Sequence, residues 1–107
     1  MLVEIEGVRQ IPEDGPRRWF VDENMDLIIW YQPDFSTITG FQLCYDKKSV
    51  QRCLTWQRGR ESKSSILSAD GQFSIKRVIR LFETACGKLP DKELNLIRLC
   101  LKETERS

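Results

Sequence analysis

Two adjacent arginines followed by two aromatic rings, Arg17-Arg18-Trp19-Phe20, could bind a phosphate or a nucleic acid. A guanidinium group binds phosphate oxygens through its N–H donors, and an aromatic ring offers a base a surface for stacking. The same residues are typical of a β-strand that begins with solvated arginines and turns one ring into the core. Because strand alternation explains the pattern without a ligand, it favours this second interpretation.

A run of cations later in the chain is the densest basic stretch of the sequence. Turns and loops carry charge for solubility, so the run alone is weak evidence for a binding site. If the fourth strand ends beside the start of the first, its last cations become neighbours of Arg17 and Arg18, and the two groups form one surface. The run consists of Lys47, Lys48, Arg52, Arg58, Arg60 and Lys63.

Cysteines could supply disulfides or a metal site. The four residues Cys44, Cys53, Cys86 and Cys100 include no C-x-x-C pair, and the chain has no histidine. Their spacing matches no zinc pattern, so we expect small core residues rather than disulfides or metal ligands. Cys44 is the one thiol considered for reactivity, and no residue near it in the sequence is placed to lower its pKa.

Carboxylates are the remaining groups with catalytic potential. Asp22, Glu23 and Asp26 lie close together in the sequence, and Asp46 follows at a later turn. Paired carboxylates can transfer protons or hold Mg²⁺, but acidic residues at strand ends are common in small domains. The usual general base, histidine, is absent. The sequence therefore predicts neither catalytic residues nor a cofactor, and whether the protein is an enzyme stays open.

The composition is that of a soluble globular domain. The 107 residues include 40% hydrophobic and 31% charged residues, with a net charge of +1. This charge gives no overall field to attract nucleic acid or anionic lipid. The first fifteen residues lack the features of a signal peptide, and the apolar runs are too short to span a membrane. We expect a single domain located in the cytoplasm.

The elements that position these residues follow from hydrophobic periodicity. Eight of the ten aromatic residues lie in residues 17–58, in strand-like runs joined by short turns. Such connections join antiparallel neighbours, which predicts a meander of three or four strands. One face of its last hairpin carries Phe41, Leu43, Tyr45, Val50, Leu54 and Trp56, with Arg52 among them, and the opposite face carries Gln42, Cys44, Cys53 and Thr55. The run 27–30 is apolar on both faces, so part of the second face is expected to be covered as well.

Helices follow the strands. Residues 59–74 form a polar loop, and residues 75–103 carry two helical patterns, with Ser74 as an N-cap and Gly87 at the end of the first helix. Residues 1–16 are an arm or an edge strand. This order predicts an α+β domain with both helices packed on one face of the sheet. The second helix has six apolar residues between Leu94 and Leu101, so it lies deep or forms a homodimer interface.

The segments RRWFVDENMDLIIWYQ, GFQLCYDKK and CLTWQRG resemble a group of small bacterial proteins that share an RRWF…DMDL…GFQLCYDK…LTW pattern and have no assigned activity. The resemblance covers residues 17–58. It implies a bacterial, cytosolic origin and gives no residue a catalytic role.

Two functions are compatible with the sequence. The first is a non-catalytic protein-interaction or regulatory module that uses Gln42, Cys44 and Thr55 on the sheet, or the second helix. The second is a nucleic-acid or phosphate-binding module that uses Arg17, Arg18, Trp19, Lys47, Lys48, Arg58 and Arg60.

Overall fold

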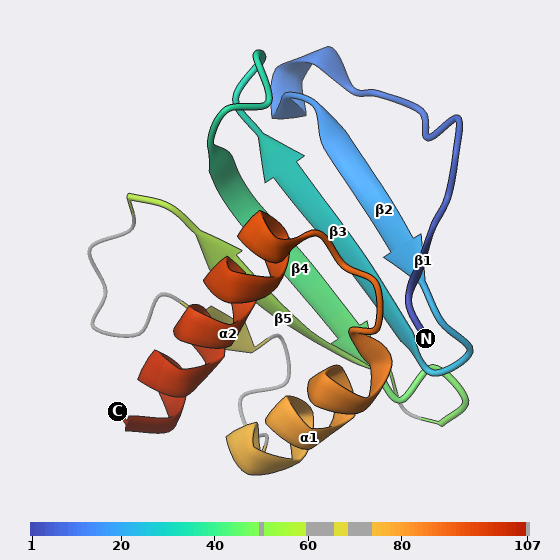
Figure 1. Cartoon of the computed structure of the whole chain (residues 1–107), viewed down its shortest axis with the longest axis vertical. Helices are drawn as coiled ribbons and strands as arrows, with labels where there is room; N and C mark the ends of the chain where they lie inside the picture. Colours follow the sequence, from blue (N-terminus) through green and yellow to red (C-terminus); the bar gives the residue numbers. More distant parts are fainter. Residues whose placement is uncertain (50, 60–65, 69–73, 107) are drawn as a thin grey trace.

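A computed structural model describes residues 1–49, 51–59, 66–68 and 74–106. It contains an antiparallel sheet followed by two α-helices, which confirms the α+β class (Figure 1). The strands are β1 (Val3–Glu4), β2 (Arg17–Val21), β3 (Met25–Tyr31), β4 (Ile38–Tyr45), β5 (Arg52–Gln57) and β6 (Ile66–Ser68), and the helices are α1 (Ile75–Ala85) and α2 (Asp91–Arg106).

Among the described residues, the strands form one sheet in sequence order, β1-β2-β3-β4-β5-β6, and every neighbouring pair is antiparallel. The meander is therefore larger than the three or four strands expected from the sequence. A short strand is added at each edge. β1 is the edge strand that the sequence left open as one of two alternatives for residues 1–16, whereas β6 has only three residues, too few for a recognisable alternation. β6 lies within the predicted polar loop 59–74, of which residues 60–65 and 69–73 are outside the described residues.

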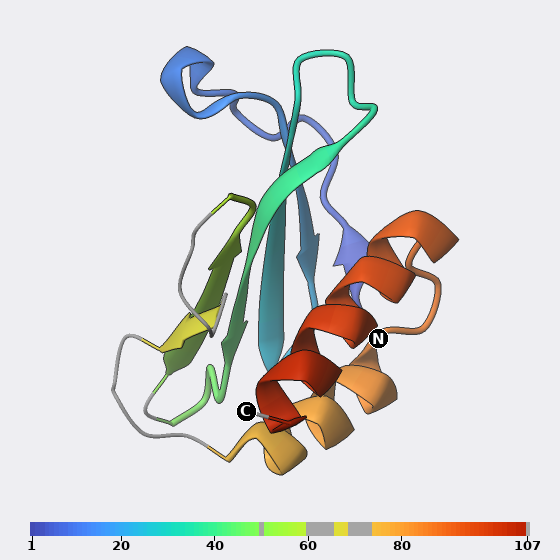
Figure 2. The ribbon, with the colours of Figure 1, turned by 90° about the vertical axis from the view of Figure 1, so that its left-hand side faces the viewer.

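Both α-helices pack on one face of the sheet, as Figure 2 shows in the edge-on view. This arrangement follows from the pleat of β3. Met25, Leu27, Ile29 and Tyr31 are buried on the helix side, whereas the residues between them are half-buried. β4 and β5 continue the same face with Phe41, Leu43, Tyr45, Leu54 and Trp56, as predicted. Val50, assigned to the same face, lies outside the described residues.

Side chains of the two helices complete the core on the covered side of the sheet. Val78 and Phe82 of α1 and Ile97 and Leu101 of α2 are almost fully buried. Ser74 caps α1 by accepting a hydrogen bond from the Arg77 backbone N–H at 3.3 Å, which confirms the predicted cap. None of the helices in the described residues combines the length and the apolar composition that crossing a membrane requires.

Candidate functional site

The face of the sheet opposite the helices carries three rows of side chains, which we call the open face. Each row crosses the sheet from β2 to β5 through directly paired residues. No α-helix of the described residues lies over it. The first row is Arg17, Trp30, Gly40 and Gln57; the second is Trp19, Ile28, Gln42 and Thr55; the third is Val21, Asp26, Cys44 and Cys53.

The first row contains a hollow of about 380 Å³ at Gly40. Trp30, Thr55, Gln57 and Arg58 are among its walls. Gly40 is required by its surroundings, because a Cβ atom there would lie 2.7 Å from the backbone carbonyl oxygen of Trp56. The close approach of β4 and β5 thus excludes a side chain at Gly40 and leaves space beside the Trp30 ring.

The second row has two apolar residues, Trp19 and Ile28, followed by two polar ones, Gln42 and Thr55. The half-buried Trp19 and Ile28 are direct cross-strand partners. Next to Ile28, the Gln42 Nε2 donates a hydrogen bond to the Thr55 hydroxyl at 3.3 Å. The Trp19 Nε1 is buried and, within the described part of the chain, lacks a hydrogen-bond partner. The row therefore combines ring surface with polar atoms, as protein interfaces do.

Arg17 connects the open face to the N-terminal arm. Its guanidinium carbon lies 5.7 Å from the centre of the Trp19 ring, within the range of a cation–π contact. The same group donates two hydrogen bonds to the backbone carbonyl of Arg9, at 3.0 and 2.8 Å. Arg17 is thus held in place over Trp19 by the arm.

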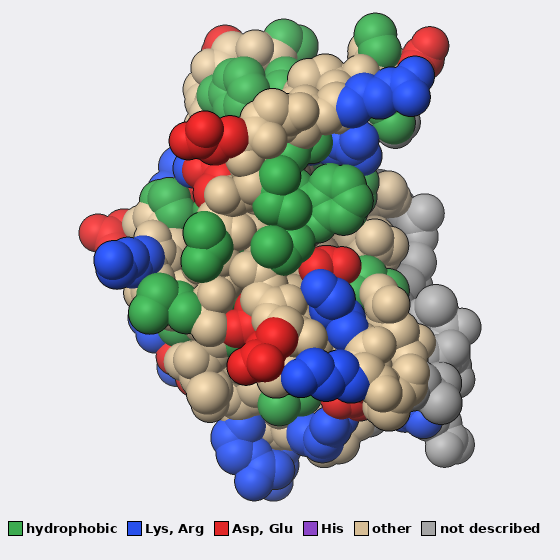
Figure 3. Space-filling view, turned by 90° about the vertical axis from the view of Figure 1, so that its right-hand side faces the viewer, with side chains coloured by type: hydrophobic (Ala, Val, Ile, Leu, Met, Phe, Trp, Pro, Cys, Tyr) green, Lys and Arg blue, Asp and Glu red, His purple; other side chains and the backbone are tan. Residues whose placement is uncertain are grey.

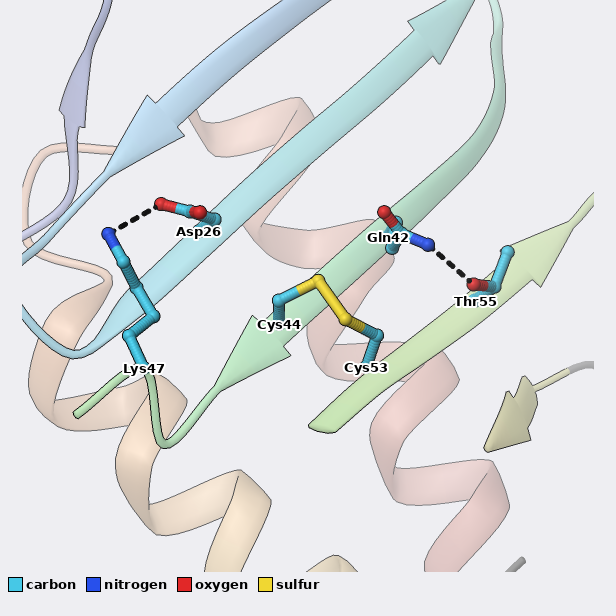
Figure 4. The surroundings of a disulfide bond; sticks show 6 residues. All are labelled: Asp26, Gln42, Cys44, Lys47, Cys53 and Thr55. Carbon is cyan, nitrogen blue, oxygen red and sulfur yellow. Dashed lines mark hydrogen bonds and ion pairs between the residues drawn. A yellow bond between two sulfur atoms is a disulfide. The ribbon is translucent and has the colours of Figure 1, made fainter. Parts of the chain in front are cut away.

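The third row contains a disulfide between Cys44 and Cys53 (Figure 4). The prediction that these cysteines pack as free thiols is wrong, because antiparallel pairing places them directly opposite each other, with Cα atoms 4.0 Å apart. Spacing along the sequence does not show this proximity; the strand register does. The prediction is confirmed for Cys86 and Cys100, which are buried free thiols, and burial raises the pKa of Cys100 to about 11.

An ion pair lies beside the disulfide on the same face (Figure 4). The Lys47 ammonium is 2.8 Å from a carboxylate oxygen of Asp26, and it also donates to the backbone carbonyl of Asp22 at 3.1 Å. Asp26 is the cross-strand partner of Cys44. The third row therefore carries one carboxylate, Asp26, and the cation that pairs with it comes from the turn after β4.

The predicted basic surface is divided by the fold. Arg17 is on the open face, whereas Arg18 points to the helix side, where it binds both carboxylate oxygens of Glu4 at 2.9 and 2.6 Å. This contact lowers the pKa of Glu4 below its ordinary value. Figure 3, which looks onto the β1 edge, shows acidic and basic groups side by side below a cluster of hydrophobic side chains.

The remaining cations are separated along the strands. Lys47 and Lys48 lie at the β4–β5 turn, and Lys48 faces Glu23 at 3.4 Å. Arg58 follows β5, at the end of the sheet where β2 begins. Its Nε donates to the carbonyl of Ile38 at 2.8 Å, and its guanidinium lies over Trp56. Arg60 and Lys63 are outside the described residues.

The carboxylates also form ion pairs with cations. Asp22, Glu23 and Asp46 line a second cavity of about 410 Å³, whereas Asp26 is on the open face. Asp22 binds the Met1 ammonium, and Asp46 binds Arg77 of α1 through two hydrogen bonds at 2.9 and 2.7 Å. Each contact lowers the pKa of its carboxyl. Among the described residues, no group of three or more histidine, cysteine or acidic side chains is arranged to hold a metal ion.

The apolar residues of α2 are largely accounted for by the fold. Ile97, Cys100 and Leu101 are buried, Leu94 and Leu96 pack partly against the core, and Leu99 is 55% exposed. The helix lies against the sheet, which is the first of the two arrangements expected from its composition. One exposed leucine is a small surface for self-association.

Trp30 and Gly40, which border the hollow, are not among the binding residues predicted from the sequence. The sequence contains a signal for each: Trp30 follows the buried Ile29 by one position, and a glycine inside a strand often marks a close backbone approach. The two become a site only when the register places them side by side.

No family model, curated protein or solved structure matches this chain. Function must therefore be inferred from the residues of the open face.

Proposed function

We propose that the protein is a non-catalytic interaction module that binds a protein partner through the open face. The observation that carries this proposal is the hollow at Gly40, bounded by Trp30 and adjoining the Gln42–Thr55 hydrogen bond. An aromatic wall next to a hollow is the arrangement in which one large side chain of a partner contributes most to binding.

The charges of this face support a protein rather than a nucleic acid. A phosphate backbone requires several cations that are available on one surface. Here Asp26 lies within the face, Lys47 is engaged by Asp26, and Arg18 is on the opposite side of the sheet. A bound polyanion would meet the Asp26 carboxylate and would have to compete with it for Lys47.

The partner fits this surface if it presents an apolar or aromatic side chain flanked by polar groups. The apolar side chain would enter the hollow beside Trp30, and the polar groups would reach Gln42 and Thr55. A cytoplasmic location, and the bacterial origin that the resemblance of residues 17–58 implies, belong to the same proposal.

The test is affinity capture from a bacterial lysate that is divided into nuclease-treated and untreated halves. We expect the wild-type chain to retain a protein in both halves and Trp30→Ala to lose it. Leu99→Ala is the matched control, since it removes an exposed apolar side chain from α2. Capture that disappears with nuclease would favour the nucleic-acid function. If Leu99→Ala loses the captured protein and Trp30→Ala keeps it, the partner binds α2 and not the open face.

A further inference from the structure

We propose that the Cys44–Cys53 disulfide is a thiol–disulfide exchange site, which reacts with thiols such as glutathione at the sulfur of Cys53. The proposal is independent of the protein partner proposed above. It starts from the position of the disulfide, which lies on the open face between two paired strands rather than in the core.

The strand pairing lets the bond open and close without a change of fold. On either side of the disulfide, Leu43 pairs with Leu54, and Tyr45 pairs with Arg52. These backbone ladders hold the two cysteines opposite each other after the sulfur–sulfur bond is broken. The reduced thiols therefore stay within reach of each other, and reoxidation is an intramolecular reaction.

Exposure differs between the two cysteine residues. Cys44 is 6% exposed, while Cys53 on the neighbouring strand is partly exposed. An attacking thiolate reaches the more open sulfur, since the exchange rate depends on access as well as on thiol chemistry. Cys53 is thus the sulfur attacked, and Cys44 is the leaving group.

The charges beside Cys44 form an ion pair. The cross-strand neighbour of Cys44, Asp26, carries a negative charge that would oppose a second anion. The Lys47 ammonium, 2.8 Å from the Asp26 carboxylate, offsets that charge. The ion pair therefore leaves little net charge to oppose the release of Cys44 as a thiolate.

The reaction balances with two thiols. The thiolate of a first thiol bonds to the Cys53 sulfur, the Cys44–Cys53 bond breaks, and Cys44 leaves with the electron pair and takes up a proton. The thiolate of a second thiol then attacks the sulfur that the first contributed, which releases Cys53 as a thiol. The protein gains two hydrogens and the two small thiols become one disulfide. In a reducing cytoplasm, disulfides of this kind are typically transient.

The two other cysteines provide an internal contrast. Cys86 and Cys100 lie in the core beside the helices, and the raised pKa of Cys100, about 11, keeps it protonated at neutral pH. We expect neither to exchange with thiols while the protein is folded.

The first arm of the test is a redox titration of the native wild-type protein against mixtures of reduced and oxidised glutathione, read by alkylation and peptide mass. We expect reversible conversion of the Cys44–Cys53 pair and no change at Cys86 or Cys100. A pair that resists reduction until the protein is denatured would overturn the proposal. So would a pair that stays as free thiols in oxidised glutathione.

The second arm uses Cys44→Ser and Cys53→Ser, each of which leaves one thiol on the open face. We expect oxidised glutathione to modify Cys53 in the first variant about tenfold faster than Cys44 in the second. Equal rates, or faster modification of Cys44, would contradict attack at Cys53. If either variant fails to fold, the wild-type titration still decides whether the pair exchanges.

Discussion

The two faces of the sheet have the same backbone and different chemistry. The face under the helices is apolar along β3, β4 and β5 except for the half-buried Arg52 at the start of β5, and its apolar side chains are almost completely buried. The open face presents two tryptophans, an amide–hydroxyl hydrogen bond, an ion pair and a disulfide. The comparison indicates that stability depends mainly on one face, which leaves the other available for binding and reaction.

The residues of β3 show this division most clearly. Ile29 is completely buried under the helices, whereas its neighbour Ile28 is half-buried on the open face. Because successive side chains of a strand point to opposite faces, two isoleucines one position apart are a matched pair for comparing the faces.

The largest expected effect is on the covered face. Ile29→Ala removes buried methyl and methylene groups and should lower the free energy of unfolding by about 2–5 kcal/mol. Ile28→Ala should lower it by roughly 1 kcal/mol, because part of that side chain already contacts water. Urea denaturation of both variants measures the difference. Equal losses would show that the open face is covered as fully as the core.

The second effect concerns the disulfide. Reduction opens a short closed loop between Cys44 and Cys53 and should lower the free energy of unfolding by about 2–3 kcal/mol. Chemical denaturation with and without a reductant measures this loss. The Cys44→Ser, Cys53→Ser double variant should be insensitive to the reductant; if it responds as the wild type does, the loss has another source.

A third comparison concerns hydrogen bonds on the two faces. On the covered face, the Tyr31 hydroxyl donates to the buried Glu93 carboxylate at 3.3 Å, and burial raises the pKa of Tyr31. Tyr31→Phe should cost about 1–3 kcal/mol, since it leaves a buried carboxylate without this donor. Thr55→Val removes the partner of Gln42 on the open face and should cost less, because the amide can bind water. Thermal unfolding of both variants measures which of them loses more stability. A larger loss for Thr55→Val than for Tyr31→Phe would contradict this prediction.

The smallest effect is the ion pair between Asp46 and Arg77, which connects the β4–β5 turn to α1. Arg77 lowers the pKa of Asp46, so the folded state holds this proton less tightly than the unfolded state. The stabilisation is therefore complete above the ordinary aspartate pKa of about 4 and is lost as the pH falls through the lower folded value.

Asp46→Asn isolates this charge. Asp46 has a φ of 58°, which asparagine tolerates, so the variant removes the charge and keeps the turn. We expect a melting temperature lower by about 2 °C at pH 7, with the difference disappearing in strong acid. A difference that persists at low pH would show that the loss does not come from the ion pair.

The helix-covered face could be predicted from the sequence because burial leaves a periodic pattern. Phe41, Leu43 and Tyr45 alternate with small or polar residues, and Ser74 and Gly87 mark the ends of α1 in the expected way. The edge strand β1 is one of the two alternatives that the sequence left open for residues 1–16, and the register with β2 decides between them. β6 was not predicted, because three residues are too short to show a pattern; it pairs with the free edge of β5.

The open face could be predicted only in part. Alternation correctly grouped Gln42, Cys44, Cys53 and Thr55, yet it did not reveal which residues of other strands lie beside them. The Cys44–Cys53 bond and the hollow between Trp30 and Gly40 depend on cross-strand register, which the alternation within one strand does not specify. For the same reason, Lys47 and Lys48, which are close to Arg58 in the sequence, lie at the opposite end of β5 from it.

The central claim is that a protein partner binds the open face, and the affinity of the captured partner for Trp30→Ala tests it most directly. We predict that the dissociation constant rises by about tenfold or more, as for a buried aromatic residue at an interface. Leu99→Ala should bind as the wild type does, and circular dichroism should show that both variants are folded. Unchanged affinity of a folded Trp30→Ala would contradict the account.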